Sequence, residues 1–389
     1  MRRFFVANLV NTIGSGIFLT TSFLAFTRGL GFEATFTTSA LGAGFALGIP
    51  FSLVVGRVND RVGAKNVYAV LLGGQALAML SYGLVSTPVA FVVVAIVSGI
   101  LDRGLAATAG AFVHELAEPS RRILTRAQLR VSTNVGIAIG SGAGALVLSV
   151  DTTRAYVAGL QANGLLFGVA LVLVTTIPGR PRARSGPGHR PRLRFLPDVR
   201  YVVATVGNTF LALHPVVVGV GLPLWLSTVD EVPLASVSAI IVANTVLVVL
   251  LQVAVARRVT DAPSARRASE LTAVALGASC VLMALLPGLP TLVAVLVLAV
   301  WVALFTVGEL LQSTVAFHAS FELAPDGQQG LYQSFYALGP GLSRALGPLL
   351  VTVLIEHAGQ LSWLVLAGLF VLGHLITSLA LRLPDPRTT

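Results

Sequence analysis

Apolar runs of about twenty residues or more recur along the whole sequence and limit what this chain can become. A helix of about 20 mostly apolar residues crosses the roughly 30 Å hydrocarbon core of a bilayer. Helices are expected because every backbone polar group must find its partner inside lipid. Twelve such segments are predicted, at about 4–27, 36–55, 67–86, 88–111, 128–150, 155–177, 201–226, 234–255, 269–287, 290–317, 331–354 and 361–382.

The composition supports a membrane protein and opposes a soluble one. Only 11% of the 389 residues are charged, whereas 55% are hydrophobic. A soluble domain carries about 25% charged residues, so this chain has too few charges to cover a water-facing surface. A single cysteine, Cys280, excludes an internal disulfide and a cysteine-based metal cluster. We expect neither a metal nor a cofactor.

Basic residues predict the orientation of the spans. With a cytoplasmic N-terminus, nearly all of the 26 basic residues fall in cytoplasmic segments, and only Arg28 and Arg154 fall in loops on the other side. This asymmetry follows the positive-inside rule. We therefore expect a multi-pass protein of the inner (plasma) membrane with both termini in the cytoplasm. The basic, apolar N-terminus also resembles a secretory signal, but its removal would leave eleven spans and disturb the asymmetry.

Residues 178–200 form the one long polar segment, rich in Pro, Gly and Arg, and divide the spans six and six. We predict a six-helix bundle over 1–177, a cytoplasmic linker over 178–200 and a second six-helix bundle over 201–389. The arginines of the linker are expected to contact anionic lipid headgroups. Nothing in the sequence supports a nucleic-acid-binding site.

The loop between the second and third spans, "GRVNDRVGAK", is unusually charged for this chain. Gly56 lacks a Cβ, so another helix can pack closely against it. Asp60 lies on the side of the membrane where the eleventh span begins, near Leu331. A carboxylate at a helix N-terminus is worth about 0.3–1 kcal/mol. The alternative is that these charges only set the topology.

This loop resembles the signature loop of the major facilitator superfamily in both spacing and position. The resemblance implies twelve transmembrane helices in two pseudo-symmetric six-helix bundles, an all-α membrane fold, with a substrate site near the midplane. It also implies that the loop latches the cytoplasmic side closed. The residues of this predicted cytoplasmic gate are Gly56, Arg57, Asp60, Arg61, Gly63 and Lys65. A second-half copy near Asp261 is degenerate.

Two further patterns resemble exporters of this superfamily. Gly136, Gly140 and Gly144 in the fifth span match part of an exporter glycine pattern, and we assign them to helix packing between the bundles. Small residues four apart also make a packing face in any membrane helix. The stretch 308–334 resembles the tenth helix and following loop of drug-efflux members, with Gln329 where an arginine is common.

Four charged residues lie inside spans, where a charge costs about 2.5–3.5 kcal/mol at the bilayer centre. We assign proton coupling to Glu309, Asp102 and Arg103, with Glu309 as the main proton carrier. The alternative for Glu309 is a fixed ion pair that only positions helices. Asp102 and Arg103 are adjacent and should point about 100° apart on a helix. Arg344 is expected in the packing between the bundles.

In the superfamily, the first, fourth, seventh and tenth helices line the central cavity. Polar and aromatic residues of these spans are therefore predicted to face the substrate, although hydrogen bonding between helices or simple packing would also explain them. The predicted cavity residues are Asn11, Phe18, Asn208, His214, Trp301 and Phe305.

The sequence favours a monomeric, proton-coupled exporter of amphipathic small molecules that works by alternating access. The first alternative is a proton-coupled importer of a sugar, amino acid or metabolite. A membrane sensor without transport and the permease subunit of an ATP-driven pump are further alternatives. No phosphate-binding loop or nucleophile elbow is present, so an enzyme is not supported.

Overall fold

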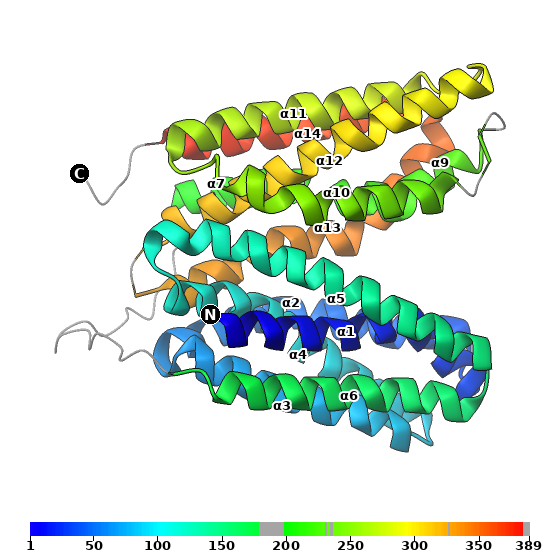
Figure 1. Ribbon diagram of the computed structural model, residues 1–389, viewed down its shortest axis with the longest axis vertical. Helices are drawn as coiled ribbons and strands as arrows, with labels where there is room; N and C mark the ends of the chain where they lie inside the picture. Colours follow the sequence, from blue (N-terminus) through cyan, green and yellow to red (C-terminus); the bar gives the residue numbers. More distant parts are fainter. Residues whose placement is uncertain (179–197, 230–231, 234–235, 326, 384–389) are drawn as a thin grey trace. The chain divides into compact units, whose positions relative to one another are not determined.

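The computed structural model describes residues 1–178, 198–229, 232–233, 236–325 and 327–383. All regular structure within these ranges is helical (Figure 1). Twelve of the described helical segments are long and apolar enough to cross a membrane, which confirms the predicted number of spans. Nearly all of the predicted arginine-rich linker lies outside the described residues.

The chain forms two compact units. Unit 1 contains Met1–Pro191 together with Pro325–Phe335, and unit 2 contains Arg192–Ala324 and Tyr336–Thr389. The helix that follows Gln328 therefore starts in unit 1 and continues in unit 2.

Unit 1 contains the first six spans. α1 packs against α5 and α6, α2 against α4, and α3 against α4 and α6. Its helices are α1 (Arg2–Leu24), η1 (Ala25–Gly29), α2 (Ala34–Val62), α3 (Ala64–Ser81), η2 (Tyr82–Leu84), α4 (Pro88–Leu116), η3 (Pro119–Arg121), α5 (Arg122–Val150) and α6 (Thr153–Thr175).

Unit 2 contains the remaining spans. α11 packs against α12 and α14, α14 against α7, and α10 against α12 (Figure 1). Its helices are α7 (Val199–Leu211), α8 (His214–Val216), η4 (Val217–Gly221), α9 (Leu222–Leu226), α10 (Ser236–Ala256), α11 (Ala262–Ala284), α12 (Thr291–Glu322), α13 (Gln329–Ala358, whose start belongs to unit 1) and α14 (Gln360–Arg382).

Several helices begin at a side chain that caps them. The Thr87 hydroxyl accepts a hydrogen bond from the backbone of Ala90, and Pro88 follows at the first helical position of α4. Thr152 caps α6 in the same way through Ala155. Such caps satisfy backbone N–H groups that have no partner within the helix, and proline at this position loses no hydrogen bond.

The seventh span is interrupted. α7 ends at Leu211, a turn follows at Ala212 and Leu213, and the helix resumes at His214 with Pro215 behind it. The π-helix η4 then follows before the span continues. π-Helical turns occur often at functional sites. At a break inside a membrane span, the freed backbone groups must be satisfied by neighbouring groups.

Small residues bring α1 and α5 into close contact inside unit 1. A Cβ at Gly140 would overlap the carbonyl oxygen of Ile13, and one at Gly16 would lie 3.0 Å from the Cα of Gly140. A Cβ at Gly144 would lie 2.8 Å from the Cβ of Thr20. Gly136 of α5 faces Thr12 of α1. The glycine face of the fifth span therefore packs on α1, and the contacts of these glycines lie within unit 1; their assignment to packing between the bundles stays a prediction.

We expect Gly140→Ala to lower the free energy of unfolding by about 1–3 kcal/mol, because the added methyl group forces α1 and α5 apart. Unfolding of the purified protein in mild detergent, followed by tryptophan fluorescence, measures this change. Gly142→Ala is the matched control, since nothing lies within 4 Å of a Cβ at that position two residues away. Equal destabilisation by the two substitutions would contradict the packing argument.

Candidate functional site

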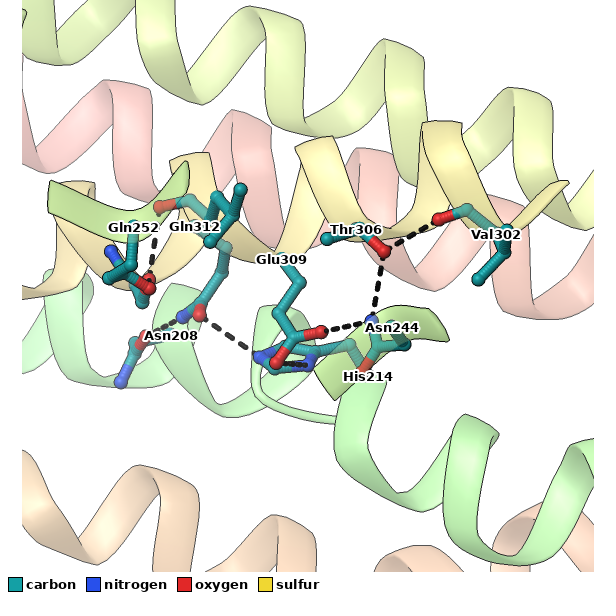
Figure 2. A network of polar contacts seen from close by, with 10 residues as sticks. Asn208, His214, Asn244, Gln252, Val302, Thr306, Glu309 and Gln312 are labelled. Atoms are coloured by element: carbon teal, nitrogen blue, oxygen red, sulfur yellow. Dashed lines mark hydrogen bonds and ion pairs between the residues drawn. The ribbon is translucent and has the colours of Figure 1, made fainter. Parts of the chain in front are cut away.

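A chain of hydrogen-bonded polar side chains runs through the interior of unit 2 (Figure 2). Thr306, Glu309 and Gln312 are three residues apart on α12 and therefore share one face of that helix. Asn208 on α7, His214 on α8 and Asn244 on α10 meet them there. Buried polar groups are costly without hydrogen-bond partners, and these side chains act as partners for one another.

Among the described contacts, Glu309 contributes the only carboxylate to this hydrogen-bonded chain of side chains. It is 9% exposed, and the Asn244 amide donates a hydrogen bond of 2.9 Å to Glu309 Oε2. The same amide donates to Thr306 Oγ1 at 3.0 Å, and the Thr306 hydroxyl donates to the carbonyl of Val302 at 2.6 Å. Asn244 therefore ties the carboxyl group of α12 to α10.

His214 approaches Glu309 from the interrupted seventh span. Its Nδ1 lies 4.0 Å from Glu309 Oε1, and its Nε2 lies 3.2 Å from Gln312 Oε1. Gln312 Nε2 in turn donates to Asn208 Oδ1 at 2.7 Å. The helix break at Ala212 and Leu213 immediately precedes the histidine.

A second polar group lies further along α12. Ser313 donates to Gln252 Oε1 at 3.2 Å, and Gln252 Nε2 donates to Thr314 Oγ1 at 3.4 Å, so this group also joins α10 to α12. Sequence reasoning missed Gln252 and Gln312 because glutamine was not considered, although the polar spacing of Thr306, Glu309 and Gln312 was a usable signal.

The structure brings together three of the predicted site residues, Asn208, His214 and Glu309. Within a membrane span, the carboxyl group accepts a hydrogen bond from the Asn244 amide and lies 4.0 Å from the His214 imidazole, an arrangement that can bind or release a proton. Within the described ranges, no three His, Cys, Asp or Glu side chains gather closely enough to hold a metal ion.

Two of the predicted cavity residues lie in the apolar core of unit 2. Trp301 and Phe305 are fully buried and stack with ring centroids 4.8 Å apart and an interplanar angle of 22°. The edge of the His214 ring faces Phe305 at 6.4 Å between centroids. These aromatic rings therefore pack beside His214 in the apolar core of unit 2, and their contact with a substrate stays a prediction.

The other predicted cavity residues belong to unit 1. Asn11 is 9% exposed, and its backbone carbonyl accepts a hydrogen bond from Ser15 at 3.2 Å. Phe18 packs among aromatic rings, 6.1 Å from Tyr82 and 6.2 Å from Phe26 between centroids. Their role towards a substrate also stays a prediction.

Asp102 and Arg103 bind each other although adjacent residues point about 100° apart on a helix, and their role in proton coupling stays a prediction. Arg103 Nη2 lies 2.5 Å from Asp102 Oδ2, and Arg103 Nε donates to the same oxygen at 3.1 Å. The arginine side chain is long enough to fold back over one residue even though the two Cβ atoms diverge. Its guanidinium also lies 4.5 Å from the ring centroid of Phe45 on α2, a cation–π contact.

Asp60 holds the start of α13. Its Oδ1 accepts a hydrogen bond of 2.7 Å from Gly330 N, and its Oδ2 accepts one of 2.9 Å from Leu331 N. Both N–H groups lie in the first turn, where they have no partner within the helix and where the helix dipole favours a negative charge. Sequence reasoning anticipated this contact; a role for it in gating stays a prediction.

Glycines allow α2 and the first turn of α13 to meet this closely. A Cβ at Gly56 would lie 2.5 Å from Ser334 Oγ and 2.7 Å from the carbonyl oxygen of Gly330. A Cβ at Gly330 would lie 2.6 Å from the Cβ of Asn59 and 2.8 Å from Asp60 Oδ1. The two glycines therefore face each other at the crossing.

The other residues of the predicted gate make contacts within unit 1 or are exposed, and their role in gating stays a prediction. Lys65 Nζ donates to the carbonyls of Thr175, at 3.3 Å, and Ile177, at the end of α6. Gly63 has a φ of +97°, which glycine adopts at little cost, and separates α2 from α3. Arg57 and Arg61 are exposed.

Glu115, which sequence reasoning did not select, caps α3. Its Oε1 accepts a hydrogen bond of 2.6 Å from Ala64 N, and its Oε2 accepts one of 3.2 Å from Lys65 N. The signal in the sequence was weak, because a glutamate near the end of α4 gives no indication of the helix it will meet.

Arg344 is exposed on α13, and its assignment to packing between the bundles stays a prediction. Asp261, the aspartate of the degenerate second-half loop, caps its own helix α11 in a reciprocal pair with Ser264. The hydrogen bond from the Ser264 hydroxyl lowers the pKa of the Asp261 carboxyl.

Solved structures of membrane transporters are similar to this chain in fold. The human organic anion transporter MFSD10 (TETRAN) is 16% identical with a TM-score of 0.70, and the match covers 97% of this chain and 98% of that chain. A bacterial homologue of the iron transporter ferroportin, with soaked iron, is 16% identical with a TM-score of 0.74, over 98% of each chain.

The transporter FucP in its outward conformation is 12% identical with a TM-score of 0.74, over 97% of this chain and 98% of that chain. Identities this low carry the fold alone. No curated protein matches the sequence.

The family that the charged loop suggested is confirmed by the sequence as a whole. The family description of the Major Facilitator Superfamily matches residues 4–325. With its twelve candidate spans and all-helical fold, the chain belongs to the Major Facilitator Superfamily of membrane transporters.

Proposed function

We propose that this transporter is a proton-coupled antiporter that exports amphipathic small molecules by alternating access, with Glu309 as the proton-binding group. The observation that carries the proposal is a carboxyl group inside a membrane span, 9% exposed and hydrogen-bonded to Asn244. Ionisable side chains in such positions are rare and usually serve ion or proton pathways.

The energetic argument concerns the charge on Glu309. A carboxylate at the bilayer centre costs about 2.5–3.5 kcal/mol on insertion scales, and protonation removes that cost. A conformation that surrounds Glu309 with donors favours the charged form, whereas an apolar surrounding favours the neutral form. Alternation between two such surroundings loads and releases one proton per cycle, and each proton moving through 100 mV supplies about 2.3 kcal/mol.

Asp60 serves in this proposal as a latch on the cytoplasmic side. Its two hydrogen bonds to the first turn of α13 are available only while α2 and that turn stay together. Opening the cytoplasmic side would break them, and their loss is worth about 0.3–1 kcal/mol. A contact of this size biases a conformational equilibrium without blocking it.

The direction of transport is proposed from the sequence. The glycine pattern of the fifth span and the loop after the tenth favour export. Import of a polar solute is the second candidate, because Asn208, His214 and Gln312 form a compact buried polar group. Amide and imidazole groups of this kind suit hydrogen-bonding ligands such as sugars or amino acids.

The proposed setting is the plasma membrane, with both termini in the cytoplasm and the protein acting as a monomer. On this orientation, the exposed side chains of Arg57 and Arg61 lie at the cytoplasmic surface. Basic residues there are attracted to anionic headgroups by about 1 kcal/mol each.

We expect Glu309→Gln to abolish proton movement coupled to solute, because the amide cannot carry the proton. Proteoliposomes with a pH-sensitive dye inside, challenged with a panel of lipophilic amines, dyes, sugars and amino acids, measure this coupling. Accumulation by the wild-type protein, about 50-fold per proton at 100 mV, should disappear in the variant. The matched control is Glu356→Gln, an exposed glutamate near the end of α13.

Retained accumulation in Glu309→Gln would overturn the assignment of Glu309. The direction of transport follows from the same assay in oriented vesicles. An exporter should concentrate solute in inverted vesicles with an acidic lumen, whereas an importer should do so in right-side-out vesicles placed in acid.

We expect Asp60→Asn to change the turnover rate by about two- to fivefold, because the amide lacks the charge that interacts with the start of α13. Exchange of labelled solute across the same proteoliposomes, without a pH gradient, measures the rate. Glu118→Gln, a neutralised exposed residue beyond α4, is the control. An unchanged rate in Asp60→Asn would show that the contact is structural only.

A further inference from the structure

We propose that Gln252 is a positioning residue for Glu309. Together with Asn244, it fixes the register of α12 against α10, so that the two helices move as one element. The register follows from contacts inside unit 2 (Figure 2), and only its consequence for proton binding rests on the proposed function of Glu309.

The two amide side chains of α10, Asn244 and Gln252, both reach α12. Asn244 Nδ2 lies 3.0 Å from Thr306 Oγ1, and Gln252 Nε2 lies 3.4 Å from Thr314 Oγ1. The partners in each pair are 62 residues apart in the sequence. On both helices the two contacts are therefore separated by the same eight residues, from 244 to 252 and from 306 to 314. Equal steps along the two helices mean that α10 and α12 run parallel in a single register.

The two threonines are held in the same way within α12. The Thr306 hydroxyl donates to the carbonyl of Val302 at 2.6 Å, and the Thr314 hydroxyl donates to the carbonyl of Leu310 at 2.8 Å. Each hydroxyl oxygen then accepts a hydrogen bond from an amide of α10. Because a hydroxyl can also donate, the same two pairs would form with either amide turned over, so the register does not depend on the orientation of the amide groups.

Gln252 resists a shift of register more strongly than an apolar side chain would. It is 0% exposed, and Ser313 Oγ lies 3.2 Å from Gln252 Oε1, so both polar atoms of the amide group have partners on α12. A slide along the helix axis would separate these atoms and leave a buried amide without hydrogen bonds. An apolar side chain would only exchange one apolar neighbour for another. A single buried amide can fix the register of a coiled coil for this reason.

Glu309 lies between the two contacts on α12. The Asn244 amide that reaches Thr306 also donates to Glu309 Oε2 at 2.9 Å. As long as Gln252 holds the register, this hydrogen bond is retained through the transport cycle. The change in the surroundings of Glu309 that the proposed function requires must then come from an element other than α10. The interrupted seventh span, which places His214 Nδ1 4.0 Å from Glu309 Oε1, is such an element.

Distances between spin labels on α10 and α12 test the register and require no solute. Leu250→Cys and Val307→Cys place the labels at exposed positions of the two helices, and Cys280→Ala removes the one native cysteine. Double electron–electron resonance on the full-length protein in lipid nanodiscs should give a single narrow distance. Gln252→Leu, which keeps a similar size without the amide, should widen the distance distribution by about twofold.

Thr314→Val and Thr314→Ser are the matched pair for this measurement. Valine keeps the shape of threonine without the hydroxyl and should widen the distribution, whereas serine keeps the hydroxyl and should leave it narrow. A loss of packing alone would instead follow the missing methyl group and affect the serine variant. Thermal unfolding establishes whether each variant is folded, and the threonine pair decides the matter if Gln252→Leu does not fold. An unchanged width in folded Gln252→Leu would overturn the inference.

A disulfide between the two helices tests whether they move as one element. Val248 and Leu310 lie midway between the two contacts, both are buried, and the register predicts that they face each other. Val248→Cys with Leu310→Cys, in the Cys280→Ala background, should therefore form a disulfide on mild oxidation. Val246→Cys with Leu310→Cys is the control and should not, because Val246 is exposed on another face of α10.

The oxidised pair should keep the coupled accumulation of solute measured in the proteoliposome assay. Loss of accumulation on oxidation, with recovery on reduction, would overturn the inference, because α10 and α12 would then have to move against each other. The two proposals fail separately. Retained accumulation in Glu309→Gln ends the proposed function and leaves the register intact, whereas an unchanged distance distribution in Gln252→Leu ends only the positioning role.

Discussion

The structure depends on the need to give every backbone polar group a partner, most strictly inside the spans, where the hydrocarbon contains no water. Helices meet this need for the backbone within each span. Where a helix starts, stops or breaks, side chains take over. Thr87 and Thr152 cap new helices, Glu115 caps α3, and Lys65 donates to the last carbonyls of α6. In the polar chain around Glu309, the buried side chains likewise act as hydrogen-bond partners for one another.

Close approach of helices is the second requirement, and glycine meets it at specific places. Without a hydrophobic driving force in lipid, helices associate through packing and hydrogen bonds, so short distances matter. Gly140 lets α5 reach the backbone of α1. Gly56 and Gly330 do the same for α2 and the first turn of α13, and this brings Asp60 within hydrogen-bonding distance of two backbone N–H groups.

The twelve spans could be predicted from the length of the apolar segments, because an apolar segment long enough to cross a bilayer is stable there mainly as a helix. The Asp60 contact could also be anticipated, since one short loop carries both the glycine and the aspartate. The pairing of Asp102 with Arg103 could not, because backbone geometry says little about where a long flexible side chain ends. His214 and Glu309 are distant in sequence, and their meeting depends on a helix break that the apolar pattern of 201–226 does not reveal.

The two aspartates that follow the second and eighth spans show why a repeated pattern does not guarantee a repeated contact. Asp60 satisfies the first turn of α13, whereas Asp261 satisfies the first turn of its own helix through Ser264. The difference lies in the neighbours. Gly56 precedes Asp60 by one helical turn within α2 and permits a close crossing, whereas Asp261 lies beyond the end of α10 and directly before α11. A carboxylate accepts from first-turn N–H groups that have no partner within their helix, so an aspartate directly before a helix caps that helix, as Asp261 does for α11.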